Sequence, residues 1–242
     1  GDLLEQGGSG RDGAVRGQVL VFDLDDTLYL EQDFVLSGFE AVAVFLQRKG
    51  VEGFAEIAAE LFFQGQRGDI FDRALEEMGL DSSALNQKAV SVERLVGIYR
   101  DHKPSIALLP DARFALDQYQ PGTKRALLSD GYRSVQQNKV DALGIQTDFQ
   151  AIFLTDTWGR SCWKPAHCAY EKVELYFDVA GDNCLYISDN PSKDFIAPNQ
   201  RGWDTIRVVR DKGIYRDAET TKGGEPRVII ESLYELSRIP QR

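Results

Sequence analysis

The stretch VLVFDLDDTLY, residues 19–29, places an apolar strand directly before closely spaced carboxylates. The unbroken apolar run 19–22 is typical of a strand that is buried on both faces, in the middle of a parallel sheet. Residues two apart point the same way in an extended chain, so Asp23 and Asp25 can approach one ligand from the mouth of that sheet. This spacing predicts a reaction centre, with a nucleophile and its acid/base partner.

The composition of the chain excludes several classes of protein. Of its 242 residues 43% are hydrophobic, which suits one large domain or a core with an inserted module. The formal net charge of -10 argues against nucleic acid as a partner, because a nucleic-acid binder needs a basic patch. No apolar run approaches the roughly 20 residues that span a bilayer, and the N-terminus lacks the apolar stretch of a signal peptide. We therefore expect a soluble, cytoplasmic monomer or homodimer that binds no membrane.

Cysteine and histidine are too sparse for a disulfide framework or a zinc site. Cys162, Cys168 and Cys184 form no CxxC pair, and an odd count suits a reducing compartment, so we expect ordinary thiols. The two histidines, His102 and His167, have no second ligand at zinc-like spacing. The sequence therefore disfavours zinc chemistry and a histidine-based triad.

The pattern of apolar residues divides the chain into segments. Residues 1–17 are rich in glycine and charge, and we expect a flexible tail there. From about residue 34 to residue 99 the apolar spacing is helical throughout, which predicts an all-helical insertion whose last helix covers 85–99. After residue 104, short apolar runs alternate with helical stretches, as in parallel α/β units. The predicted strands are 125–128, 151–154, 184–187 and 205–209, and the predicted helices are 111–119, 134–143, 166–177, 194–201 and 226–237.

Polar residues follow three of the predicted strands. Asp23 and Asp25 follow the first, the run Ser129-Asp130-Gly131 follows the second, and residues 188–194 follow the fourth. In open parallel sheets ligands bind at the carboxyl ends of the strands, so these residues are expected to meet in one crevice. Lys164-Pro165 is expected to open a helix beside the same crevice, with proline near its first position.

The charges in this crevice predict a metal ion. Asp23, Asp25, Asp189 and Asp194 would repel one another unless some are protonated or a cation lies among them. Oxygen ligands in an incomplete shell suit Mg²⁺, which leaves room for a substrate phosphate. The expected cofactor is therefore Mg²⁺, and the expected ligand is a small phosphorylated substrate.

Phosphoryl transfer gives each polar residue a role. Lys164 and Mg²⁺ would neutralise the transferring group, while the Ser129 hydroxyl and the backbone N–H groups at Asp130 and Gly131 would bind its other oxygens. Asp23 would attack phosphorus to form an aspartyl-phosphate. Asp25 would protonate the leaving oxygen and then activate water.

Taken together, these motifs resemble the haloacid dehalogenase-like hydrolase superfamily. The match consists of Asp23-Leu24-Asp25-Asp26-Thr27, Ser129 after a strand, Lys164-Pro165 and the run 188–194, in that order. The resemblance implies a Rossmann-like parallel-sheet core of residues 18–29 and 105–242, with a helical cap of residues 30–104 inserted between the first two motifs. The one departure is Ser188, where glycine is usual and serine is also accepted.

The resemblance also implies how the metal is held. The carboxylate at the position of Asp189 coordinates Mg²⁺ together with the nucleophile, Asp23, and the backbone carbonyl of Asp25. Asp194 matches an acidic position whose role varies between contact with the metal and orientation of the lysine.

Asp25 discriminates between the activities that the superfamily offers. Dehalogenases lack the acid/base aspartate because a departing halide needs no proton, so Asp25 favours phosphoester hydrolysis. A phosphomutase of a sugar phosphate remains the alternative, and a haloacid dehalogenase or a non-catalytic phosphometabolite-binding protein is less favoured.

Overall fold

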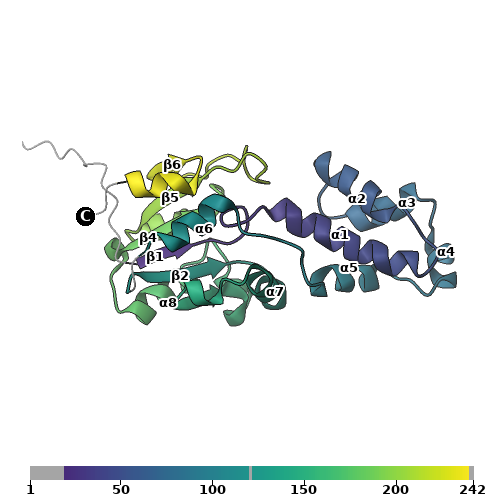
Figure 1. Ribbon diagram of the computed structural model, residues 1–242, viewed down its shortest axis with the longest axis horizontal. Coiled ribbons are helices and arrows are strands. Elements are labelled where there is room, and N and C mark those ends of the chain that lie inside the picture. Colours follow the sequence, from purple (N-terminus) through teal and green to yellow (C-terminus); the bar gives the residue numbers. More distant parts are fainter. Residues whose placement is uncertain (1–18, 120–121, 240–242) are drawn as a thin grey trace, which may run out of the picture.

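The computed structural model describes residues 19–119 and 122–239, and the tail expected over 1–17 lies outside these ranges. Within them, six parallel strands form one sheet in the order β3-β2-β1-β4-β5-β6 (Figure 1). This is the predicted Rossmann-like α/β architecture. The strands are β1 (Val19–Phe22), β2 (Lys124–Ser129), β3 (Ala151–Leu154), β4 (Cys184–Ser188), β5 (Asp204–Val208) and β6 (Val228–Ile230).

The central strand β1 is buried on both faces, as its unbroken apolar run predicts. Val19 and Val21 belong to one core cluster, with residues of α8 (Cys168–Phe177) and α9 (Ile196–Gln200). Leu20 and Phe22 belong to another, with residues of α6 (Pro110–Asp117) and α7 (Arg133–Leu143). Alternate side chains of one strand therefore enter different cores, which leaves no position on β1 for a polar residue before Asp23.

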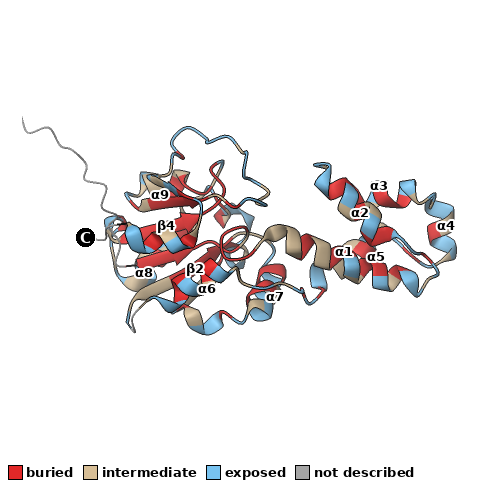
Figure 2. Cartoon of the chain, turned by 45° about the horizontal axis from the view of Figure 1, so that its top comes forward, coloured by how far each residue is buried: buried red, intermediate tan, exposed pale blue. Residues whose placement is uncertain are grey.

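A helical insert, α1 to α5, lies between β1 and β2 in the sequence. Figure 1 shows it at the end of the elongated molecule away from the sheet, and its inward-facing residues form a buried core of their own (Figure 2). α1 and α5 approach closely at Gly38, where an added Cβ would lie 2.3 Å from the ring of Tyr99. Among the described residues, no helix is long and apolar enough to cross a membrane. The helices are α1 (Glu31–Gln47), α2 (Phe54–Phe63), α3 (Ile70–Glu77), α4 (Ser82–Gln87) and α5 (Val92–Asp101).

Two predicted helices were wrong. The helix expected over 226–237 is replaced by β6 and a short 3₁₀ helix, Leu233–Arg238, because the β-branched run at 228–230 favours a strand that extends the sheet. The helix expected over 85–99 is divided into α4 and α5. Ala89 lies between them with a φ of +53°, and the Ser91 hydroxyl then caps α5 by accepting a hydrogen bond from the N–H of Arg94.

The prediction of three ordinary thiols was also wrong. Cys162 and Cys168 form a disulfide with their Cα atoms 5.1 Å apart, and Cys184 is a buried free thiol. The pair lacks the CxxC spacing, and the sequence wrongly predicted that a helix opens at Pro165. α8 instead begins at Cys168, so the preceding loop is free to bring the two sulfur atoms together. The disulfide removes the cysteine argument for a reducing compartment.

Titration of thiols in denatured protein tests this pairing. For protein purified without reductant we expect one reactive thiol per chain, from Cys184, and three after reduction. Cys184→Ser is the matched control, which should show none before reduction and two afterwards. Three reactive thiols in the unreduced protein would contradict the disulfide.

Candidate active site

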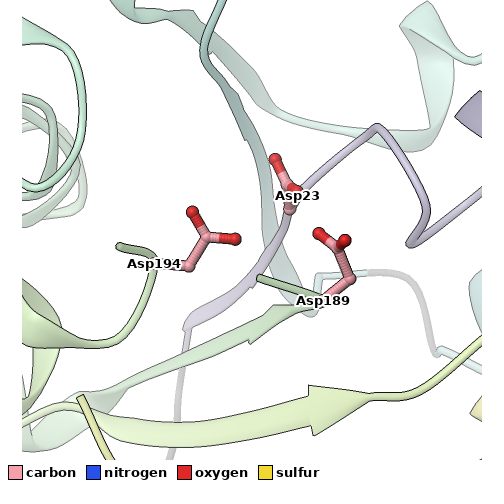
Figure 3. Close-up of side chains that lie close together, drawn as sticks. All are labelled: Asp23, Asp189 and Asp194. Atoms are coloured by element: carbon pink, nitrogen blue, oxygen red, sulfur yellow. The ribbon is translucent and has the colours of Figure 1, made fainter. Parts of the chain in front are cut away.

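Three buried carboxylates meet at the carboxyl end of the sheet, as Figure 3 shows. Asp23 follows β1 and Asp189 follows the neighbouring β4, so parallel pairing of these strands places the two side by side. Asp194 approaches from the loop that precedes α9. Each residue offers one oxygen, and these oxygens all lie within 4.8 Å of one another. The structure therefore brings together three of the four predicted metal ligands.

Lys164 lies against this acidic group. Its Nζ donates to Asp23 Oδ1 at 3.0 Å and to Asp194 Oδ1 at 3.2 Å. The other oxygen of Asp194 accepts hydrogen bonds from the Ser188 hydroxyl at 2.5 Å and from the N–H of Asn190 at 3.1 Å. Asp194 is thus held by the β4 loop and faces Lys164. Ser188 makes a hydrogen bond that the more usual glycine could not make.

The acidic group carries more negative charge than Lys164 balances. The pKa of Asp23 is raised to about 6, chiefly by burial; Lys164 opposes the rise, and repulsion from Asp194 and Asp25 adds to it. Burial likewise raises the pKa of Asp189 well above its ordinary value, with added repulsion from Asp194 and Asp23. A cation among these oxygens would relieve the repulsion. An all-oxygen donor set is the kind that Mg²⁺ prefers, so the residues fit the expected ion.

The residues after β2 lie on the side of β1 opposite to β4, and Asp130 and Gly131 line the cavity there. Ser129 is fully buried, and its Oγ accepts a hydrogen bond from Gln136 Nε2 at 2.6 Å. Gly131 lines the cavity with a φ of +121°, and a Cβ there would lie 3.0 Å from Gln136. Glycine is therefore required at this position, both by its backbone conformation and by the close approach of Gln136.

The side chain of Asp130 holds the lysine loop. Its two oxygens accept the N–H of Lys164, each at 3.1 Å, and it also accepts hydrogen bonds from Thr155 Oγ1 at 2.8 Å and Lys193 Nζ at 3.0 Å. The carboxylate is committed to these partners, so only its backbone N–H is suited to binding an anion. The predicted substrate-binding role of Asp130 is thus restricted to its main chain.

Asp25 lines the same cavity as the acidic group but has hydrogen-bond partners of its own. Its carboxylate accepts hydrogen bonds from Lys139 Nζ at 2.7 Å, from Gln136 Nε2 at 2.9 Å and from the hydroxyl of Tyr29. Burial alone would raise the pKa of Asp25, but the ion pair with Lys139 and these hydrogen bonds hold it below its ordinary value. The structure therefore does not place this carboxylate among the other three predicted metal ligands.

Lys139 and Gln136 were missed by sequence reasoning. Both lie on α7 and are buried, on the face that also presents Val135 and Val140 to the core. The available signal was a pair of polar residues, three apart, at positions where helical spacing requires apolar ones. Buried polar groups need partners, and Asp25 and Ser129 are those partners here.

A cavity of about 140 Å³ opens onto the three carboxylates and Lys164. Core loops and the helical insert both contribute to its wall, because Glu31 at the start of α1 lines it together with Trp163, Lys193 and Tyr215. Substrate in this cavity would contact both parts of the chain.

Comparison with known proteins agrees with this architecture. The model of a family described as haloacid dehalogenase-like hydrolase matches residues 20–208. Over 230 residues the chain is 24% identical to glyceraldehyde 3-phosphate phosphatase from Methanocaldococcus jannaschii, covering 90% of this chain and 94% of that protein.

Solved structures share the fold of both the sheet region and the helical insert. YfnB from Bacillus subtilis, a magnesium-bound protein assigned to the HAD hydrolases, aligns with a TM-score of 0.66 and 18% identity, over 93% of this chain and 98% of that one. L-2-haloacid dehalogenase from Xanthobacter autotrophicus aligns with a TM-score of 0.59 and 21% identity, over 92% and 97%. At these identities the likeness shows the fold alone.

Proposed function

The chain belongs to the haloacid dehalogenase-like hydrolases, and we propose that it is a Mg²⁺-dependent phosphatase of small phosphorylated metabolites. The observation that carries this proposal is that Asp25, two residues after Asp23, lines the same cavity but is held by its own hydrogen-bond partners and is not one of the three clustered carboxylates. A departing alkoxide needs a proton, whereas a departing halide does not. Asp25, with partners of its own and suited to general acid/base catalysis, therefore favours phosphoester hydrolysis over dehalogenation. The 24% identity to a phosphatase over most of both chains supports the same activity.

The proposed reaction divides into two steps. In the first, an oxygen of Asp23 forms a bond to phosphorus, the ester P–O bond breaks, and Asp25 delivers a proton to the leaving oxygen. In the second, water loses a proton to Asp25 and attacks the aspartyl-phosphate, which releases inorganic phosphate and restores the Asp23 carboxylate. Asp25 enters the first step protonated and regains that proton in the second, so the two steps conserve protons, although Lys139 favours the ionised form of Asp25 in the free protein.

The other residues would stabilise charge on the phosphoryl group. Lys164, held by Asp194 and by the Asp130 carboxylate, places its ammonium against the oxygen of Asp23 that is 3.0 Å away. The Ser129 hydroxyl and backbone N–H groups at Gly131 would bind phosphoryl oxygens. Asp23, Asp189 and the backbone carbonyl of Asp25 would hold Mg²⁺, which when bound supplies further positive charge to the phosphoryl oxygens.

We propose that residues 30–104, which contain the helical insert, act as a cap over residues 18–29 and 105–242. Glu31 already forms part of the cavity wall. Closure of such a cap would exclude bulk water during the first step. The chemical identity of the phosphoester would then depend on residues that the insert contributes.

Release of inorganic phosphate tests the proposal. We expect turnover of 4-nitrophenyl phosphate and of at least one member of a panel of phosphorylated sugars, nucleotides and short acids. Removal of Mg²⁺ with EDTA should reduce the rate by about 100-fold or more, because a metal contributes several kcal/mol to charge stabilisation. Asp189→Asn, which keeps the shape of the side chain, should reproduce much of that loss in the presence of Mg²⁺. Chloride release from 2-chloropropionate without phosphate release would contradict the proposal.

Product analysis separates hydrolysis from the phosphomutase alternative. With a hexose 1-phosphate as substrate, a phosphatase yields free phosphate and the hexose, whereas a mutase yields the 6-phosphate isomer. We expect free phosphate, because water is the second-step acceptor in the proposed reaction.

A further inference from the structure

Lys139 is a buried charged residue with no place in the reaction described so far. Its exposed fraction is 4%, and it is not among the residues that line the cavity. Its Nζ lies 2.7 Å from Asp25 Oδ1 and 4.3 Å from the centre of the Phe34 ring. Lysine is almost never fully buried unless it is paired, so a lysine at this position requires a partner that justifies its loss of solvation.

The contacts of Lys139 belong to a set that fixes both oxygens of Asp25. Oδ1 accepts hydrogen bonds from Lys139 and from the Tyr29 hydroxyl, and Oδ2 accepts one from Gln136. The same Nε2 of Gln136 also donates to Ser129 Oγ at 2.6 Å. Gln136 and Lys139, one turn apart on α7, therefore hold Asp25, and Gln136 also holds Ser129. In the proposed reaction Asp25 and Ser129 act on different oxygens of the substrate.

Lys139 also connects Asp25 to the helical insert. The ring under its ammonium belongs to Phe34, in the first turns of α1. Phe34 packs in turn against Tyr99 of α5, with ring centres 5.6 Å apart, and against His102 at 5.0 Å. Phe34 of the insert therefore forms part of the surroundings of Lys139, although Lys139 itself lies on α7, beside the sheet.

We propose that Lys139 is a positioning residue that holds the Asp25 carboxylate toward the leaving oxygen, in a position that depends on the packing of α1 against α7. This inference rests on the proposed phosphatase function. Lys139 does not line the cavity, and among the aspartates of the site its only hydrogen bond is to Asp25, so we infer that it acts through Asp25. The chain thus uses two buried lysines for different aspartates, Lys164 for Asp23 and Asp194, and Lys139 for Asp25.

Substitution of Lys139 should affect turnover and leave substrate binding nearly unchanged. Lys139→Met retains the apolar stem and removes the charge. We expect kcat to fall about 100-fold, the loss typical of a misplaced catalytic group, with KM changed by less than about threefold. Lys139→Arg keeps a donor for Asp25 and should recover most of the lost kcat. Lys222→Met, at an exposed lysine, is the matched control and should behave as the unsubstituted protein.

A double-variant cycle with Asp25 separates positioning from a general effect on structure. If Lys139 acts through Asp25, Lys139→Met should change kcat little in a chain that already carries Asp25→Asn. Additive losses, or a single Lys139→Met variant with unchanged kcat, would overturn the inference. Thermal unfolding of each variant, measured alongside, ensures that rates refer to folded protein.

Phe34→Leu tests the connection to the insert. This change keeps an apolar side chain but removes the ring under the ammonium, so we expect an intermediate loss of kcat that is not additive with the loss from Lys139→Met. Full additivity, or no loss in Phe34→Leu, would contradict the part of the inference that concerns α1.

Crystal structures of the Lys139→Met and Lys139→Arg variants test the inference without reference to turnover. In Lys139→Met the Asp25 carboxylate should rotate away from Tyr29 and Gln136, and in Lys139→Arg it should stay. If it rotates but the unsubstituted protein hydrolyses no phosphoester, the proposed function fails and the positioning role stands. If the unsubstituted protein is active and Asp25 does not move, the positioning role alone fails.

Discussion

Asp23→Asn should abolish phosphate release, with kcat lowered at least about 10⁴-fold, because loss of the nucleophile removes the covalent route altogether. An amide oxygen has the shape of the carboxylate oxygen but cannot form a stable bond to phosphorus. Lys164 would keep its contact with Asp194 at 3.2 Å, so the variant should fold with the lysine in place. The measurement is the initial rate of phosphate release at saturating substrate and Mg²⁺.

Rapid acid quenching gives this prediction a second readout. Denatured protein from a reaction with labelled substrate should carry an acid-stable, base-labile phosphoryl group, and the Asp23→Asn protein should carry none. Asp72→Asn, at an exposed position on α3, is the matched control and should retain full turnover and labelling. Undiminished turnover in Asp23→Asn would contradict the assignment of the nucleophile.

The grouping of Asp23 with Asp189 was predictable because it follows from topology. Strands that pair in parallel end at the same edge, so residues placed directly after apolar runs meet there whatever their separation along the chain. The same reasoning could not choose the partners of each oxygen. It placed Asp25 with the metal ligands and Asp130 on the substrate, whereas hydrogen bonds commit these side chains to Lys139 and to the Lys164 loop.

Such partners are set by packing between distant segments. Lys139 is 114 residues from Asp25, and it reaches it only because α7 packs beside β1. The Cys162–Cys168 pair was missed for a local reason, since the sequence predicted a helix from residue 166, whereas the loop extends to Cys168. The positions of the strand ends could thus be predicted from the pattern of apolar residues in the sequence. The partners of each side chain could be identified only from the three-dimensional structure.

Arg210→Met should lower the free energy of unfolding by about 3–5 kcal/mol, because it leaves a buried carboxylate without its partner. Arg210 Nη1 donates to Asp111 Oδ2 at 2.5 Å, and the two side chains have exposed fractions of 8% and 7%. The guanidinium also donates to the carbonyl of Thr27, and Asp111 accepts the N–H of Leu233 at 2.7 Å. One ion pair therefore joins the chain after β5, the start of α6, the loop beyond Asp25 and the C-terminal 3₁₀ helix.

Chemical denaturation measures this effect against an exposed pair of the same type. Arg216 and Asp211 also form an ion pair, but their side chains have exposed fractions of 46% and 93%, so Arg216→Met should cost less than about 1 kcal/mol. In a double-variant cycle with Asp111→Asn, the combined cost should be smaller than the sum, because each single variant leaves one buried charge unpaired and the double variant leaves none. Equal costs for Arg210→Met and Arg216→Met would contradict the role assigned to burial.

The difference in free energy of unfolding between the unsubstituted protein and Arg210→Met should decrease as the pH falls. Burial alone would raise the pKa of Asp111, but hydrogen bonds from Arg210 and from the N–H of Leu233 hold it below its ordinary value. A carboxyl with a lowered pKa in the folded state contributes stability above its unfolded pKa, roughly 4, and loses that contribution as the pH falls through the folded value. The cost of Arg210→Met should therefore be full near neutral pH and shrink as falling pH protonates Asp111, because a protonated Asp111 no longer needs the guanidinium. A cost that stayed constant down to low pH would show that the lost hydrogen bond to Thr27, and not the ion pair, dominates the effect.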